Sequence, residues 1–203
     1  MRLVVSISGS SGAIYGVRLV EVLARQAGIE THLVITPGAK KTIEYETKYE
    51  GAAVESLAHT VYNDNDVGAA IASGTFITDG MVVAPCSVKT LSAIATSYND
   101  TLTARAADVC LKERRKLVLV VRETPLHVGH LRLMTSVTEA GGVILPPVPG
   151  FYTRPQTIAD LVDHTITKIL DQFGLDGGLV ERWTGLPRTL NETPASPPPQ
   201  TAG

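Results

Sequence analysis

Short apolar runs alternate with segments of helical periodicity along most of this chain. Five runs rich in Val, Ile and Leu predict buried strands, at Arg2–Ser8, Glu30–Thr36, Gly80–Pro85, Leu117–Arg122 and Gly142–Leu145. A weaker strand is expected near His59–Tyr62. Strands that are apolar almost throughout and are separated by helices predict a parallel sheet that is covered on both faces.

The segments between these runs carry apolar residues at helical spacing. They predict helices at Ile14–Ala27, Lys40–Thr47, Val88–Tyr98, Leu102–Arg115 and His130–Ala140. A longer amphipathic helix, Ile158–Phe173, follows the Pro-rich turn LPPVPGFYTRP. Right-handed crossovers then give a single α/β domain over residues 1–188 with a doubly wound, Rossmann- or flavodoxin-like sheet. The Pro-rich residues 189–203 are expected to form a disordered tail.

Composition narrows the class of protein. The chain has 203 residues and a formal net charge of −2, which argues against a general nucleic-acid binder. Its two cysteines, Cys86 and Cys110, are too few for a disulfide framework and favour a reducing cytoplasm. No apolar run reaches the length of a membrane-spanning helix, and the apolar start at Arg2 is too short for a signal peptide. A soluble cytoplasmic protein is expected.

In a doubly wound sheet, ligands bind beyond the carboxyl ends of the strands. This rule selects four junctions that are expected to converge on one crevice, at Ser8–Gly12, Thr36–Lys40, Pro85–Thr90 and Arg122–Pro125. The first such junction is GSSG, Gly9–Gly12, where Ser10 and Ser11 offer hydroxyl and N–H groups to an anion at a helix N-terminus. The spacing is not that of the dinucleotide motif G-x-G-x-x-G, and Thr36 and Pro37 stand where ribose recognition would need an acidic residue. The junction therefore favours a phosphate over NAD, with a simple tight turn as the alternative.

A second cluster of polar groups follows the strand that ends at Pro85. Ser87 and Thr90 flank Lys89 at the start of a helix and could bind an oxyanion or phosphate. The alternative is a serine that caps the helix beside a lysine in solvent. Cys86 could be a nucleophile at this helix N-terminus, but a cysteine that closes a buried strand is more often a small apolar residue.

Two charges end the fully apolar strand at Leu117–Arg122. Arg122 suits a phosphate or a flavin carbonyl, and Glu123 suits proton handling or a hydrogen bond to Ser11, whereas a mutual surface ion pair is the alternative. His127 and His130 have no evident third metal ligand, so ordinary polar residues at a helix start are expected there.

The helix TARAADVCLKERRK is rich in basic residues. Arg105 and Lys112 are seven positions apart and share a helix face, which could reach a second phosphate in a neighbouring subunit. A solvated basic surface is the alternative for such a run of charges.

Longer motifs add a family resemblance that covers Ser8 to Trp183. The chain resembles the UbiX/Pad family of flavin prenyltransferases in six stretches, SGSSGAIYG, EYET, PCSVKTLSAIA, RAADVCLKERRKLVLVVRETPLHVGHLRLM, GGVILPPVPGFYTRPQT and ERW. The resemblance implies metal-independent transfer of a dimethylallyl group from dimethylallyl monophosphate to N5 and C6 of reduced FMN. It also implies a homododecamer with sites where subunits meet, and a product, prenylated FMN, that serves a UbiD-type decarboxylase.

The same resemblance implies roles for individual residues. The implied FMN contacts are Gly9, Ser10, Ser11, Thr36, Ser87, Val88, Lys89, Thr90 and Arg122. The implied prenyl-phosphate site consists of Tyr152, Lys168, Arg105 and Lys112, with Trp183 close by. The implied catalytic residues are Glu46 as the base near the flavin edge, Ser11 and Glu123 as a proton relay, and Lys112 on the leaving phosphate.

Two positions depart from the family pattern. Pro37 stands where relatives often have a residue with a backbone donor, and it is expected to weaken local flavin contacts. Lys168 stands where some members have arginine, so it keeps the charge but loses the bidentate geometry.

Two other functions remain open at this stage. An FMN-dependent decarboxylase of the cysteine-decarboxylase type would need a PxSAN-like turn and a catalytic histidine, but the turn here is PCSVKT and residues 37–47 contain no histidine. A non-catalytic flavin carrier would keep the flavin site beside a degraded phosphate site, whereas the implied phosphate-binding residues are all present.

Overall fold

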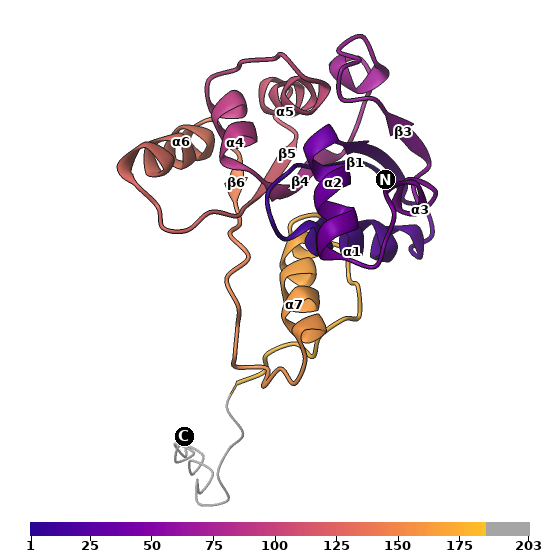
Figure 1. Ribbon diagram of the computed structural model, residues 1–203, viewed down its shortest axis with the longest axis vertical. Coiled ribbons are helices and arrows are strands. Elements are labelled where there is room, and N and C mark those ends of the chain that lie inside the picture. Colours follow the sequence, from indigo (N-terminus) through magenta and orange to yellow (C-terminus); the bar gives the residue numbers. More distant parts are fainter. Residues whose placement is uncertain (186–203) are drawn as a thin grey trace, which may run out of the picture.

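Six strands form one parallel sheet at the centre of the structure, a computed structural model that describes residues 1–185 (Figure 1). The strands are β1 (Arg2–Ile7), β2 (Glu30–Ile35), β3 (Thr60–Tyr62), β4 (Gly80–Cys86), β5 (Lys116–Val121) and β6 (Val143–Ile144). Their order is β3-β2-β1-β4-β5-β6, and each neighbouring pair is parallel. The chain thus winds outward in both directions from the β1–β4 pair, which confirms the predicted doubly wound α/β fold.

Helices cover both faces of this sheet. One face packs against α1 (Ala13–Ala24), α2 (Pro37–Glu46), α3 (Gly51–Glu55) and α7 (Ile158–Asp171). The other face packs against the 3-10 turn η1 (Ala70–Ala72) and the helices α4 (Val88–Ala95), α5 (Leu102–Lys112) and α6 (Val128–Glu139). In Figure 1, α7 lies along α1, whereas α6 lies at the outer end of the other layer beside α4.

The two layers explain why the strands have almost continuous apolar sequences. Successive residues of β5 alternate between the two cores, with Val118 and Val120 on the α1 side and Leu117 and Leu119 on the α5 side. All four side chains are fully buried. A strand that is buried on both faces has no polar face, so its sequence loses the alternation typical of a half-exposed strand.

Several helices end earlier than the apolar periodicity predicts. The helix expected at Leu102–Arg115 ends at Lys112, and Arg114 has a left-handed backbone with φ of 57°. The helix expected at Val88–Tyr98 ends at Ala95, and Ser97 has φ of 52°. A residue with a left-handed backbone terminates a right-handed helix. The spacing of apolar residues does not indicate where such a residue occurs.

The weak strand predicted near His59–Tyr62 is present as β3, at the edge of the sheet. Residues 189–203, predicted to be a Pro-rich tail, lie outside the described part of the chain. Within residues 1–185, the helices are too short or too polar for any of them to cross a bilayer.

Gly16 allows α1 to lie unusually close to the sheet. A Cβ atom at this position would overlap the carbonyl oxygen of Ala84 on β4 and would lie 2.8 Å from Cγ1 of Ile7 on β1. The absence of a side chain at Gly16 therefore brings α1 directly over the β1–β4 pair, where the winding direction reverses.

Replacement of Gly16 by alanine should destabilise the fold by about 3 kcal/mol, because a backbone carbonyl cannot move aside as a flexible side chain can. Urea unfolding of the Gly16→Ala variant would measure the change. Ala24→Ser, on the exposed end of the same helix, is the matched control and should change the free energy of unfolding by less than about 0.5 kcal/mol. Equal stability of the two variants would contradict this account.

Candidate active site

Hydrogen bonds join the strand ends that the sequence predicts to converge. The buried hydroxyl of Ser8 donates to the carbonyl of Pro85 (2.8 Å) and accepts the N–H of Ser87 (2.8 Å), so the first and third junctions are in direct contact. The N–H groups of Thr36 and Arg122 donate to carbonyl oxygens at the ends of β1 and β4, both at 3.1 Å. The predicted convergence of the four junctions in one crevice is therefore confirmed.

Two helices begin at this crevice with side-chain caps. Ser87 accepts the N–H of Thr90 (3.2 Å) at the start of α4, and Thr36 accepts the N–H of Ala39 (3.2 Å) at the start of α2. Pro37 occupies the first position of α2, where the N–H would have no partner within the helix and where proline is favoured. The positive ends of both helix dipoles thus lie beside the carboxyl ends of β2 and β4.

The N-terminus of α1 has a different cap. Gly12 is the N-cap residue, with φ of 95°, and has no side chain that could accept a hydrogen bond. The carboxylate of Glu46, from the last turn of α2, accepts instead, through Oε2, the N–H groups of Gly12 (2.7 Å) and Ala13 (3.2 Å). The hydroxyl of Ser11 is close enough to this carboxylate to lower its pKa. Glu46, which is 34 positions from Gly12 in the sequence, therefore caps the helix that follows the GSSG junction.

These contacts keep Glu46 ionised. Partial burial raises the pKa of Glu46, but the hydroxyl of Ser11, the hydrogen bonds from Gly12 and Ala13 and the charge of Arg122 together hold it below its usual value. The crevice consequently contains a carboxylate that is ionised at neutral pH.

The remaining groups of the crevice fit a phosphorylated flavin. The hydroxyl oxygen of Ser10 is buried and has no hydrogen-bond partner among residues 1–185, so a ligand that reaches it would satisfy it. A Cβ on Gly12 would lie 4.0 Å from Cγ of Arg122, which places this arginine against the same loop. Lys89 is exposed at the start of α4. An unpaired hydroxyl, two cations and helix N-termini are suitable partners for FMN.

Glu123 has a different environment from Glu46. Its carboxylate accepts the N–H of the adjacent Thr124 at 2.9 Å, whereas the hydroxyl of Ser11 acts on the pKa of Glu46. The proton relay through Ser11 and Glu123 stays a prediction. His127, in the loop that follows, accepts the N–H of Gly129 (3.0 Å) and caps α6, as expected for a polar residue at a helix start.

Lys112 lies away from the crevice in the same chain, and Arg105 pairs with other groups. Lys112 is the last residue of α5, next to the amino end of β5, and forms an ion pair with Glu113. Since the six residues of β5 span about 20 Å, Lys112 and Arg122 lie at opposite edges of the sheet. Arg105 donates to the carbonyl of Ala72 (3.1 Å) and pairs with a neighbouring aspartate on α5.

A third group of predicted residues surrounds the segment between β6 and α7. Tyr152 packs its ring edgewise against Trp183, with ring centres 5.7 Å apart, and both side chains line an open cavity of about 660 Å³. The hydroxyl of Tyr152 is 3.0 Å from Nε2 of His164. Lys168 is exposed on α7 and lies 3.8 Å from the carboxylate of Asp171.

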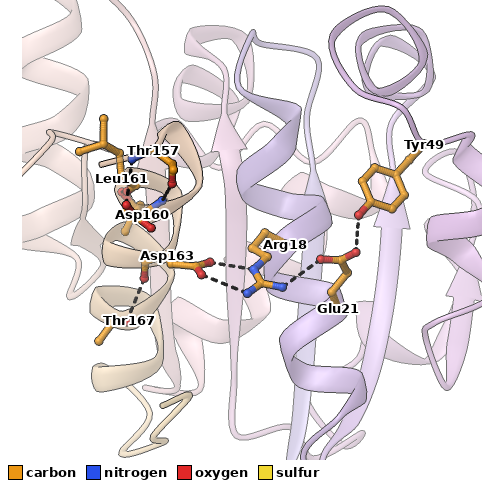
Figure 2. A network of polar contacts seen from close by, with 9 residues as sticks. Arg18, Glu21, Tyr49, Thr157, Asp160, Leu161, Asp163 and Thr167 are labelled. Atoms are coloured by element: carbon orange, nitrogen blue, oxygen red, sulfur yellow. Dashed lines mark hydrogen bonds and ion pairs between the residues drawn. The ribbon is translucent and has the colours of Figure 1, made fainter. Parts of the chain in front are cut away.

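A polar network that sequence reasoning missed holds α7 against α1 (Figure 2). Arg18 on α1 forms two hydrogen bonds with Asp163 on α7, at 2.7 and 3.1 Å, and a third with Glu21 at 3.2 Å. Glu21 accepts a further bond from the hydroxyl of Tyr49 (2.5 Å). Arg18 lies on a mostly apolar helix that packs against the sheet. Nothing in the local sequence indicates that its partner, Asp163, is 145 positions away.

Comparison with known proteins identifies the family. A sequence model of the family described as Flavoprotein matches residues 1–169. The chain is 60% identical over 185 residues to the flavin prenyltransferase UbiX of Thauera aromatica, covering 91% of this chain and 95% of that protein. This chain belongs to the UbiX flavin prenyltransferase family.

Solved structures of UbiX proteins have the same fold. AnUbiX (PadA1) in complex with FMN and dimethylallyl pyrophosphate superposes with a TM-score of 0.90 at 50% identity, over 92% of this chain and 98% of that one. A dodecameric FMN-dependent UbiX-like decarboxylase from Escherichia coli O157:H7 gives a TM-score of 0.90 at 48% identity, over 91% and 100% of the two chains. The family predicted from the sequence is thereby confirmed.

Neither cysteine of this UbiX-family chain is a nucleophile in the folded state. Burial raises the pKa of the Cys86 thiol far above its usual value and that of Cys110 to about 11. Both side chains are buried. Cys86 is therefore the small apolar residue that closes a strand.

A thiol reagent such as dithionitrobenzoate should react with neither cysteine in the native protein at pH 8, because thiolate is scarce and access is blocked. In guanidinium chloride both thiols should react rapidly. Absorbance of the released thionitrobenzoate gives the count. Rapid release of one equivalent from native protein, lost in Cys86→Ala, would restore a nucleophilic role for Cys86.

Proposed function

We propose that this chain, as a UbiX-type flavin prenyltransferase, transfers a dimethylallyl group from a dimethylallyl phosphate to reduced FMN. The observation that carries the proposal is the ionised carboxylate of Glu46, held at the N-terminus of α1 by Ser11, Gly12 and Ala13, in a crevice where α2 and α4 also begin. This arrangement offers one set of groups for an anionic cofactor and one base beside it.

Each residue of the crevice has a specific task in this reaction. When bound, reduced FMN supplies N5 and C6 as nucleophilic positions. The GSSG junction would hold its phosphate through hydroxyl and N–H groups, and Thr36, the turn Ser87–Thr90 and Arg122 would contribute further FMN contacts. At N5, a bond would form as the C–O bond of the prenyl donor breaks, its electron pair would leave with the phosphate, and N5 would lose its proton. At C6, a bond would form to the other end of the prenyl group once the prenyl double bond has taken up a proton, and C6 would then lose its own proton. Glu46 takes the proton that C6 loses.

In this proposal Lys168, Arg105 and Lys112 supply positive charge to the leaving phosphate, and Tyr152 supplies a hydroxyl donor. Because Lys112 lies across the sheet from Arg122, one chain does not assemble the full set around one crevice. We infer that the protein is a homo-oligomer in which α5 of one subunit completes the site of another. The dodecamer formed by the UbiX-like protein of E. coli O157:H7 supports this inference.

The identity of the donor and the recipient of the product are finer parts of the proposal. The family resemblance favours dimethylallyl monophosphate, whereas the AnUbiX (PadA1) complex contains dimethylallyl pyrophosphate. Prenylated FMN would serve a partner decarboxylase of the UbiD type in the cytoplasm. The second candidate function, decarboxylation by this chain itself, is favoured by the descriptions of the E. coli O157:H7 relative and of an Aquifex aeolicus relative as decarboxylases.

An anaerobic assay with reduced FMN and dimethylallyl monophosphate tests the proposal directly. Mass spectrometry should show that the flavin gains one five-carbon prenyl unit. Glu46→Gln should slow this gain by about 100-fold while FMN stays bound, because the amide cannot take the proton. Glu44→Gln, on the exposed surface of the same helix, is the matched control and should be fully active.

Two results would reject this mechanism. An unmodified flavin in the wild-type assay, with either donor, would favour a flavin carrier, and carbon dioxide release from a hydroxybenzoate without a partner enzyme would favour a decarboxylase. Full activity of Glu46→Gln would remove the base from the mechanism but leave the transferase activity intact.

Complementation between subunits tests the shared site. Lys112→Ala and Glu46→Gln should each be inactive, but oligomers co-assembled from equal amounts should recover about a quarter of the wild-type rate, because some sites then combine both intact residues. Lys116→Ala, near the same end of α5, is the matched control for loss of charge and should be active alone. Mixed oligomers without activity would mean that Lys112 and Glu46 serve the same subunit's site, and a Lys112→Ala variant that is active alone would mean that Lys112 has no role.

A further inference from the structure

The contact between Tyr152 and His164 determines whether the tyrosine hydroxyl is free to donate a hydrogen bond to a ligand. Tyr152 lies in an irregular segment and is half-exposed, whereas His164 lies on α7 and is only 8% exposed. The two rings meet edge to face with centres 5.5 Å apart, and the tyrosine oxygen is 3.0 Å from Nε2 of the histidine. Either atom can be the donor, so the position of the imidazole proton decides the direction of this bond.

The other ring nitrogen decides that direction. Nδ1 of His164 is buried and has no hydrogen-bond partner among residues 1–185. A proton on Nδ1 would leave a buried N–H group without an acceptor, which is rarer in folded proteins and less tolerable than an unpaired lone pair. The tautomer with its proton on Nε2 is therefore favoured, and its Nε2–H donates to the oxygen of Tyr152.

We propose that His164 is a positioning residue that directs the hydroxyl proton of Tyr152 toward the phosphate of the prenyl donor. Because the histidine donates to the tyrosine oxygen, the O–H bond of Tyr152 points away from His164 and is free to donate. The reverse direction would present only oxygen lone pairs to a phosphate that is already negative. The inference rests on the proposed role of Tyr152 in binding the prenyl phosphate.

The surrounding contacts hold His164 in place. The preceding residue, Asp163, is bound by both nitrogens of the Arg18 fork, which ties this turn of α7 to α1 (Figure 2). A capping box between Thr157 and Asp160 begins the same helix. A Cβ on Gly150 would lie 2.9 Å from Cε1 of His164, so the backbone of the tyrosine segment approaches the imidazole closely. The ring consequently has little freedom to turn away.

Steady-state kinetics of flavin prenylation, with dimethylallyl monophosphate as the varied substrate, tests this role. His164→Leu removes the donor and should lower kcat/KM about tenfold, whereas His164→Gln keeps an N–H donor and should recover most of it. Thr165→Val, a buried neighbour on α7 whose hydroxyl bonds only to a carbonyl of the same helix, is the matched control and should match the wild type.

A double-mutant cycle separates action through Tyr152 from a general effect on the fold. If His164 acts through the tyrosine hydroxyl, His164→Leu should have no further effect on kcat/KM in a Tyr152→Phe background. The same tenfold loss in both backgrounds would overturn the proposal, as would a His164→Gln variant as impaired as His164→Leu.

Failure of the underlying function gives a different result. A wild-type protein that leaves FMN unmodified would overturn both the proposed function and this inference. A wild-type protein that prenylates FMN, with Tyr152→Phe equally active, would overturn only the roles of Tyr152 and His164.

Discussion

The close packing of α1 on the β1–β4 pair is the constraint on which the rest of the site depends. Gly16 lets this helix touch the backbone of β4, so the N-terminus of α1 lies at the point where the winding direction of the sheet reverses. The GSSG junction then has no side chain of its own to cap the helix, because its last residue is Gly12. Glu46 fills that position, and the need for a helix cap thereby places a carboxylate inside the crevice.

The helix α1 also positions α7, which carries residues proposed to bind the prenyl phosphate. Arg18 holds α7 through Asp163, two helical turns from the GSSG junction, and α7 carries both His164 and Lys168 (Figure 2). The groups proposed to bind the flavin, at one end of α1, and those proposed to bind the prenyl phosphate, on α7, therefore share one support. This geometry suits a reaction that joins two ligands, because both must be held in register.

Charged residues lie at both edges of the sheet, so in the proposed reaction more than one subunit is needed to complete a site. Arg122 lies at the carboxyl edge with the flavin groups, whereas Lys112 lies at the opposite edge. A lone chain would bind a flavin without the full set of cations for a leaving phosphate. Oligomerisation would then add charge where a phosphate departs and would exclude water from the reacting atoms.

The sequence by itself determined the parallel sheet, its helices and the four strand ends that form the crevice, because burial on both faces and helical periodicity are local signals. The family motifs also singled out Glu46 and Tyr152. Only the tertiary structure decided which groups those residues contact: Ser11 and Gly12 for Glu46, His164 for Tyr152, and Asp163 for Arg18. These pairs are formed by segments far apart in the chain or by the turn of a helix, and hydrogen-bond direction depends on three-dimensional surroundings that no local pattern encodes.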